Sequence, residues 1–287
     1  GIRYQPHPAF AVDAAGRPRY ADLDEASLGD RSQIGDFEYT GTRELDAADF
    51  AYQIKRLVRP RIESPGLAIF SQIVSLEDLA ARLREEVDAG RLNPDGWIDM
   101  RRFPLEGVET PDPHTLRIRI RGKYPQFLNW LATTFVVPVP WEAERFYAQP
   151  GMARRELTLD MWPVGTGPFM MERNQPLREI RLVRNPEYRR DLYPCEGEPG
   201  DAEAGLLADC GKPLPLVDGF RFSYEKEATP FWNKFLQGYY DIYASTRFAT
   251  FTGFDTALQL QGGALSLSPA MERQGIRLRT EVEPAIE

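Results

Sequence analysis

The stretch Pro163-Val164-Gly165-Thr166-Gly167-Pro168-Phe169-Met170-Met171 decides how the fold of this chain is interpreted. Gly165 and Gly167 permit backbone angles that are closed to other residues, and Pro168 favours an extended approach before it. Two glycines beside a threonine could cradle a phosphate, but no Gly-Lys-Ser/Thr follows and no third glycine opens a helix. We therefore expect a tight corner that leads into a short apolar strand, with a second strand over residues 180–183.

The composition is that of a globular protein with an acidic balance of charge. The 287 residues are 42% hydrophobic, enough for one large domain or two modest ones. The net charge of -8 argues against nucleic acid as a partner, because such an interface needs an excess of lysine and arginine. No run of about 18 apolar residues occurs, so no segment is expected to span a membrane. The sequence begins at Gly1 without a signal segment, so we expect either a removed leader or a part of a longer protein.

The two cysteines, Cys195 and Cys210, bracket an acidic, glycine-rich segment and are not spaced as Cys-x-x-Cys. With only two histidines in the chain, a zinc site of the usual kind cannot be assembled. A disulfide between the cysteines would close a loop of about 15 residues and contribute about 3 kcal/mol through chain entropy. Free thiols and a disulfide both remain open at this point.

The hydrophobic periodicity predicts helices and strands that alternate without strict βαβ order, so the expected fold class is α/β with mixed sheets. A helix is expected after Asp46 as N-cap, with Asp49 completing a capping box, and another after Ser75, ending at Gly90. The other expected helices are 125–135, 141–147, 230–236 with Thr229 as its N-cap, and 269–274, the last two ended by Gly238 and Gly275. The other expected strands are 36–39, 220–224, 240–243, 276–279 and a hairpin over 108–121 with its corner at 110–113.

The usual catalytic constellations are absent from the sequence. There is no Gly-x-Ser-x-Gly elbow, no His-Glu-x-x-His and no Walker lysine. His7 and His114 lie in proline-flanked segments, where loop residues are expected rather than ligands or bases. The acidic residues Glu196, Glu198, Asp201 and Glu203 could chelate calcium, but they lack the spacing of a known loop, and a solvated acidic loop is the favoured interpretation.

Six motifs together resemble one known family, the family 5 bacterial extracellular solute-binding proteins, which are the peptide-binding components of ABC importers. The motifs are Leu45-Asp46-Ala47-Ala48-Asp49-Phe50-Ala51-Tyr52 with Arg56 and Pro60, Ser64-Pro65, Val108-x-x-x-Asp112-x-x-Thr115-Leu116, Gly165-Thr166-Gly167-Pro168-Phe169, Asn185-Pro186-x-Tyr188 and Gly238-Tyr239-Tyr240-Asp241-Ile242. Each motif is weak alone, but six in the family's order are specific.

The resemblance implies a two-lobed fold of the periplasmic-binding-protein kind (type II) that closes on a ligand. Its implied divisions are 1–40 in the first lobe, 41–160 as an inserted smaller α/β subdomain, and 161–250 returning to the first-lobe sheet. An insert loop is expected at 193–215, and 251–287 would begin the next lobe. Family members are much longer, so the chain looks like an internal fragment with an incomplete fold. The implied periplasmic location favours the Cys195–Cys210 disulfide.

The resemblance also implies a function. We expect a periplasmic, monomeric binding component, not an enzyme and without cofactors, that delivers a peptide or similar small solute to a membrane permease. Phe70 and Trp162 are the residues expected to line the ligand cleft, with plain core packing as the alternative for both. The alternative functions are a sensory or interaction domain on the same fold and a carboxylate-based hydrolase.

Overall fold

The computed structural model describes residues 1–62, 64–243, 257–261 and 264–279. By their contacts these residues form two compact units, Gly1–Phe222 and Ser223–Glu287, and each is described separately. Helices and short antiparallel sheets mix along the whole chain, as the α/β prediction requires. In the described residues no helix has the length and apolarity needed to cross a membrane.

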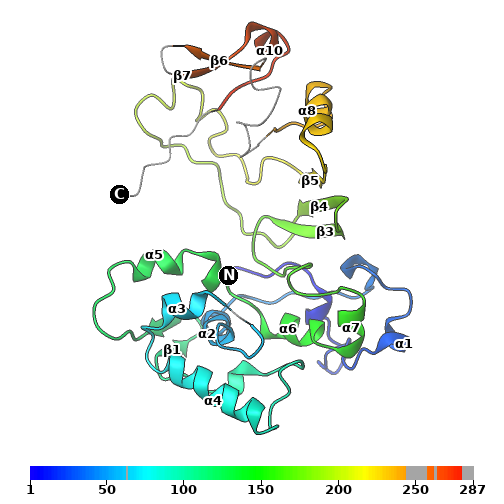
Figure 1. Cartoon of the computed structure of the whole chain (residues 1–287), viewed down its shortest axis with the longest axis vertical. Helices are drawn as coiled ribbons and strands as arrows, with labels where there is room; N and C mark the ends of the chain where they lie inside the picture. The colour runs from blue at the N-terminus through cyan, green and yellow to red at the C-terminus, as the bar shows by residue number, and fades with distance from the viewer. Residues whose placement is uncertain (63, 244–256, 262–263, 280–287) are drawn as a thin grey trace. The chain divides into compact units, whose positions relative to one another are not determined.

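Helices dominate the first unit, together with one hairpin and one small sheet (Figure 1). Its helices are α1 (Glu25–Leu28), α2 (Ala47–Arg56), α3 (Gly66–Phe70), α4 (Leu76–Asp88), α5 (Phe127–Leu131), α6 (Trp141–Tyr147) and α7 (Pro150–Arg154). Its strands are β1 (Val108–Asp112), β2 (Thr115–Ile118), β3 (Phe169–Gln175), β4 (Glu179–Arg184) and β5 (Gly219–Ser223), which reaches one residue into the second unit.

One hydrophobic core lies among α2, α3, α4, α5 and the β1–β2 hairpin, which Figure 1 shows gathered on one side of the first unit. Ile54, Phe70 and Leu83 are fully shielded from solvent there. Helix α2 begins as predicted, because the Asp46 carboxylate accepts hydrogen bonds from Ala48 N and Asp49 N. Its apolar side then packs against the β1–β2 hairpin and the 3-10 helices Met100–Arg102 and Thr134–Val136, and this packing fixes the core.

A second hydrophobic core joins the first residues of the chain to α1, α6 and α7. Tyr4, Met152 and Leu157 are fully buried in it, and Trp162 and Val164 close it just before the Gly165 corner. Gly151 is required in this core, because a Cβ at that position would lie 2.7 Å from the Asp24 carbonyl oxygen. The start of the chain and the residues before the corner therefore share one core.

A three-stranded sheet in the order β3-β4-β5 follows the corner. Strands β3 and β4 pair antiparallel from Phe169↔Arg184 to Gln175↔Glu179, with an irregularity between Met171 and Arg173. This confirms the prediction of two strands after the corner.

The second unit contains α8 (Ala228–Leu236), β6 (Leu258–Gln261), β7 (Ala264–Leu267) and α10 (Pro269–Arg273). Strands β6 and β7 pair antiparallel. Helix α8 has no fully buried residue. Its Phe231 ring packs against Tyr240 and Tyr243, which follow the helix, with the Phe231 and Tyr243 centroids 4.6 Å apart. Gly238 and Gly275 follow their helices with φ of 78° and 77°, which confirms both as stop positions.

Three predicted strands are wrong, each because a side chain or its surroundings favour another structure. Over 36–39 the Asp36 carboxylate accepts hydrogen bonds from Ser32 N and Gln33 N, which winds the chain into a 3-10 helix (Ile34–Asp36). At 240–243 the Tyr240 hydroxyl donates to Glu225 and its ring packs on Phe231, so the segment joins an aromatic cluster. At 276–279 no neighbouring strand is paired within the described residues.

Three helix boundaries and the hairpin corner also differ from the predictions. Ser75 precedes α4 but takes a φ of 60° and makes no capping bond, because its hydroxyl lies near Glu106, 3.5 Å away. Helix α8 begins two residues earlier than expected, with Glu227 as N-cap instead of Thr229. The helix expected over 125–135 is shorter, since only Phe127–Leu131 is α-helical. The hairpin strands extend to Asp112, so the turn lies at Pro113-His114.

Candidate binding site around the crossover

The predicted corner is held by the side chain and backbone of one residue from the start of the chain, Gln5. Gln5 N donates to the Gly165 carbonyl at 2.9 Å, and Gln5 Nε2 donates to the Pro163 carbonyl at 3.2 Å. In return, Gly165 N donates to Gln5 Oε1 at 3.1 Å. Gln5 is 7% exposed, so these bonds satisfy a buried amide that would otherwise be costly. We call Gln5 together with Pro163–Gly167 the crossover.

Asn185 holds the other side of the crossover. Its Nδ2 donates to the Gly167 carbonyl at 2.8 Å, its backbone N donates to the Pro168 carbonyl at 2.9 Å, and its Oδ1 accepts from Glu187 N at 3.0 Å. The glycine motif and the Asn-Pro-x-Tyr motif therefore form one hydrogen-bonded unit. The structure gives both motifs a role in shaping the backbone.

A directed chain of hydrogen bonds runs from His7 to the crossover. Ala9 N donates to His7 Nδ1 at 3.1 Å, so in the neutral ring the proton lies on Nε2. Nε2 then donates to the Tyr147 hydroxyl at 2.8 Å, and that hydroxyl donates to the Trp162 carbonyl, also at 2.8 Å. Every polar atom of the His7 ring and the Tyr147 hydroxyl thus has a partner.

Burial fixes the protonation of both groups in this chain. Desolvation lowers the pKa of His7 to about 3, because the ring is 1% exposed and has no carboxylate beside it to favour the charged form. Desolvation also raises the pKa of the Tyr147 hydroxyl well above its usual range. His7 was expected to be a loop residue; it lies in a loop, but that loop is part of the core.

The two residues predicted to line a ligand cleft lie in separate cores. Phe70 is fully buried in the first core, with its ring edge-to-face against Phe127 at 6.1 Å between centroids. Trp162 is 4% exposed in the second core, next to the crossover. The structure does not bring them together, and both are packed as core residues are. Ligand contact by either residue stays a prediction.

Arg43 connects the start of the chain to α2 and α6. Its guanidinium uses all five of its N–H donors, on Asp49 (2.6 and 2.8 Å), Glu142 (2.7 and 2.9 Å) and the Glu44 carbonyl (2.9 Å). Both carboxylates are thereby bound in the paired geometry that suits guanidinium. A group with this many partners has no capacity left to bind a ligand.

A second ionic cluster surrounds Glu144 on α6. Its carboxylate accepts from Arg56 and Arg59, each at 2.7 Å, and from the Tyr52 hydroxyl. Burial and this carboxylate raise the pKa of Tyr52 far above its ordinary value. The sequence analysis did not predict the Arg43 cluster or the Glu144 cluster. The alternation of acidic and apolar residues in Trp141–Tyr147 could have indicated a helix whose acidic side chains pair with arginines of other segments.

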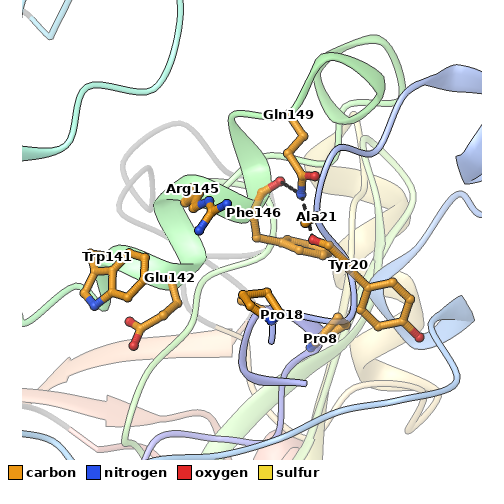
Figure 2. Close-up of a pocket in the computed structure, with 10 residues that line it drawn as sticks. Pro8, Pro18, Tyr20, Ala21, Trp141, Glu142, Arg145, Phe146 and Gln149 are labelled. Carbon is orange, nitrogen blue, oxygen red and sulfur yellow. Dashed lines mark hydrogen bonds between the residues drawn. The ribbon is translucent and has the colours of Figure 1, made fainter. Parts of the chain in front are cut away.

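A small pocket lies between α6 and the start of the chain (Figure 2). Helix α6 contributes Trp141, Glu142, Arg145 and Phe146, and Gln149 lies between α6 and α7. The facing segment contributes Pro8, Ala9, Pro18, Tyr20 and Ala21. The Gln149 amide anchors the two sides, since its Nε2 donates to the carbonyls of Tyr20 (3.3 Å) and Phe146 (2.9 Å), as the dashed lines in Figure 2 mark. Sequence reasoning did not identify this pocket.

Aromatic and cationic groups continue from this pocket along α6. The rings of Trp97 and Trp141 stack with centroids 6.2 Å apart, and the Arg101 guanidinium lies 3.5 Å from the Trp141 centroid. Arg101 is also paired with Asp99, through two bonds of 2.7 Å.

Cys195 and Cys210 form a disulfide, as the resemblance implied. The neck of their loop is held by Tyr193 N donating to the Lys212 carbonyl (2.9 Å) and Gly211 N donating to the Tyr193 carbonyl (3.0 Å). Within the described residues no group of His, Cys, Asp or Glu side chains is arranged to hold a metal ion.

Comparison with sequence families assigns most of the chain to a known family. The profile described as "Bacterial extracellular solute-binding proteins, family 5 Middle" matches residues 38–284. Among individual proteins, a Brucella ovis protein described as an ABC transporter peptide-binding protein is 28% identical over 89 residues. That match spans 30% of this chain and 16% of the relative, so the chain accounts for a small share of the relative's length.

Solved structures also resemble parts of the chain. The substrate-binding domain of an oligopeptide ABC transporter from Bacillus anthracis is 17% identical, with a TM-score of 0.48, over 75% of this chain and 34% of that one. The murein tripeptide binding protein MppA of Escherichia coli is 20% identical, with a TM-score of 0.42, over 68% and 30% of the two chains.

Proposed function

Since the chain belongs to the bacterial extracellular solute-binding proteins of family 5, we propose that it acts in the periplasm as the substrate-binding part of an ABC importer. The single observation that carries this proposal is the profile match, which covers residues 38–284 and so includes most of the chain. The confirmed strands after the crossover and the disulfide are compatible with it.

The proposed ligand is a peptide or a similar small solute. The Brucella ovis relative is described as peptide-binding, and the Bacillus anthracis protein as part of an oligopeptide transporter. The proposed mechanism is closure of two lobes around the ligand, followed by delivery to the membrane permease. Backbone hydrogen bonds would then supply affinity without depending on side-chain identity.

We also propose the lobe divisions that the resemblance implies. Residues 1–40 and 161–250 would belong to one lobe, 41–160 to an inserted subdomain, and 251–287 to the beginning of the next lobe. The crossover, where Gln5 meets Gly165, supports the pairing of the first two segments. Phe70 and Trp162 would contact a ligand only if lobe movement exposed them, because both are buried here.

The protein is proposed to be a monomeric binding protein and not an enzyme. A hydrolase built on carboxylates would need two acidic groups that face a shared cavity. The pocket of Figure 2 is lined by one acidic residue, Glu142, and both of its oxygens are bound by Arg43.

Thermal unfolding in the presence of peptides tests this proposal. The protein, expressed from its whole reading frame, is mixed with pools of di- to pentapeptides, and positive pools are resolved by calorimetry. A peptide at a hundredfold excess over its Kd should stabilise the folded state by about 2.7 kcal/mol and raise Tm accordingly. If no peptide pool raises Tm, the peptide part of the proposal fails. Size-exclusion chromatography with light scattering tests the monomer, and adjacent permease and ATPase genes would support the importer.

A further inference from the structure

Arg145 is the cation of the pocket that lacks a carboxylate partner. It is half-buried on α6 and lines the pocket, yet it makes no ion pair with any residue that the structure describes. Glu142 and Arg101, the charged residues near it, are both paired. Glu142 is bound by Arg43 through both oxygens, and Arg101 is bound by Asp99 through two nitrogens.

The surroundings of Arg145 favour a ligand group that is planar and negatively charged. Its guanidinium lies 5.6 Å from the centroid of the Trp97 ring, which stacks on Trp141. Figure 2 shows the Arg145 side chain extending from α6 toward the side where Pro8 and Pro18 lie. Most of the residues that line the pocket are apolar, and its two charged residues are Arg145 and Glu142. Both oxygens of Glu142 are bound by Arg43, so Arg145 is the charged group left to meet a ligand.

A carboxylate meets these requirements. A partly desolvated guanidinium is stabilised by an anion, and the planar carboxylate matches its two parallel N–H donors. The pocket measures about 30 Å³, which is room for one or two water-sized groups. A single carboxylate therefore fits, whereas a whole peptide does not, and the rest of such a ligand would extend out of the pocket.

We propose that this pocket is a subsite for one carboxylate group of the bound solute, with Arg145 as the binding cation and Trp141 as an aromatic wall. The inference rests on the proposed function, solute binding, and adds the chemical class of the solute. The cluster of Arg43 with Asp49 and Glu142 keeps one net negative charge beside the pocket. That charge opposes any carboxylate, and Arg145 offsets it for one. A second carboxylate would meet no further unpaired cation among the residues that line the pocket, so the preferred solute carries one at this point.

Titration with a small aromatic acid tests the subsite directly. Phenylacetate is added to the purified protein, and tryptophan fluorescence excited at a wavelength that phenylacetate does not absorb is followed. The neutral isostere phenylacetamide is titrated in parallel. Phenylacetate should bind, and phenylacetamide should bind at least about tenfold more weakly, because it cannot form the charged pair with Arg145. Equal binding of the two, or no binding of phenylacetate up to 50 mM, overturns the proposal.

Variants assign the effect to Arg145. R145Q should weaken phenylacetate at least about tenfold, and R145K should retain part of the affinity, because lysine keeps the charge without the paired donors. The control is R117Q, which removes an exposed guanidinium paired with Glu109 at 3.1 Å and should leave binding unchanged. Unchanged binding in R145Q overturns the proposal. If R145Q does not fold, the comparison of acid and amide on the unaltered protein still decides.

Peptides identify the source of the carboxylate. Gly-Phe is compared with Gly-Phe amide for a terminal carboxylate, and N-acetyl-aspartate amide represents a side-chain carboxylate. Binding of phenylacetate through Arg145 without binding of any peptide would support the subsite and contradict the peptide part of the proposed function. Peptide binding that is equal for acid and amide, and unaffected by R145Q, would support the function and contradict the subsite.

Discussion

His7 shows how its surroundings decide the chemistry of a single side chain. A solvated histidine is charged in mild acid, but this one accepts a hydrogen bond from Ala9 N at Nδ1 and donates from Nε2 to Tyr147, and the first of these bonds requires the neutral ring. Charging the ring would break the first bond and place a cation among Phe10, Phe146 and Tyr147. The cost of that charge is expressed in the lowered pKa of His7.

The stability of the fold should therefore depend on pH through His7. The pKa of His7 is about 3 when folded and 6.5 in its unperturbed state, so the unfolded chain takes up the proton first as pH falls. The contribution of neutral His7 is complete above pH 6.5 and is lost between 6.5 and 3, by about 1.4 kcal/mol per pH unit. Urea unfolding at pH 7.5, 6.5, 5.5 and 4.5 measures it.

Two variants separate this effect from that of the carboxylates. H7F removes the titrating group and should flatten the fall in unfolding free energy between pH 6.5 and 4.5. H114Q replaces the only other histidine, which is exposed, and should retain the full slope. An identical slope in H7F and the unaltered protein would contradict the role assigned to His7.

At this scale the sequence predicted too little. His7 lies between Pro6 and Pro8, so its immediate neighbours indicate a loop and nothing more. Its partner Tyr147 is 140 residues away, and no local pattern connects the two. Arg145 was missed for the same reason, since its pocket is completed by Pro8 and Pro18 from a distant segment. Phe70 and Trp162 were chosen by position within a resemblance, and the structure places both in cores.

At the scale of elements, predictions held where the signals were local. The Asp46–Asp49 capping box fixed the beginning of α2, and α6 matches its predicted bounds, Trp141–Tyr147. The alternation of Leu116 and Ile118 identified the hairpin. The prediction of a strand at 240–243 was wrong because the pattern of one segment does not reveal whether a neighbouring strand exists to pair with it.

The glycines of the crossover differ from their expected role. Neither Gly165 nor Gly167 takes a left-handed φ. A Cβ on Gly165 would meet nothing closer than Gly167 N at 4.0 Å, and one on Gly167 would meet nothing within 4 Å. The expectation that these glycines provide angles closed to other residues is therefore wrong for this conformation. The hydrogen bonds from Gln5 and Asn185, rather than glycine angles, shape the corner.

Alanine at both positions should leave the fold stable. In the double variant G165A/G167A the free energy of unfolding should stay equal or rise by about 0.4–1 kcal/mol per site, since alanine restricts the unfolded chain. The matched control is G122A, where the space around the Cβ is also open but φ is 69°, and a loss of about 1–2 kcal/mol is expected. Urea unfolding measures all three proteins. A loss above about 2 kcal/mol in the double variant would show that the corner needs glycine.

At the scale of the whole molecule, the loop closed by the Cys195–Cys210 disulfide belongs to the first unit but lies outside its two hydrophobic cores. Its two cysteines are 15 residues apart, its neck is fixed by Tyr193, and the Tyr193 hydroxyl also donates to the Leu206 carbonyl within the loop. Acidic residues there repel one another, and no lysine or arginine lies between Cys195 and Cys210 to balance them. The rest of the unit has cores that do not include this loop.

Removing the disulfide should open the loop and leave the rest of the fold in place. In the C195S/C210S variant, a protease that cleaves after glutamate should cut at Glu196, Glu198 or Glu203 faster than in the unaltered protein. The free energy of unfolding should fall by no more than about 3 kcal/mol, the chain-entropy value for such a loop. Mass spectrometry locates the cuts, and the unaltered protein with and without reductant is the control. Equal cleavage rates would mean that the neck alone orders the loop.

The hydrogen bond between Gln5 and Gly165 also has a consequence for folding during synthesis. These partners are 160 residues apart, so Gln5 leaves the ribosome long before the residue that binds it. At about 5–20 residues per second, the gap lasts roughly 8 to 32 s. For most of that time Tyr4 and His7 lack α6 as well as the crossover, so side chains that are buried in the folded protein stay uncovered until α6 and the crossover have been made.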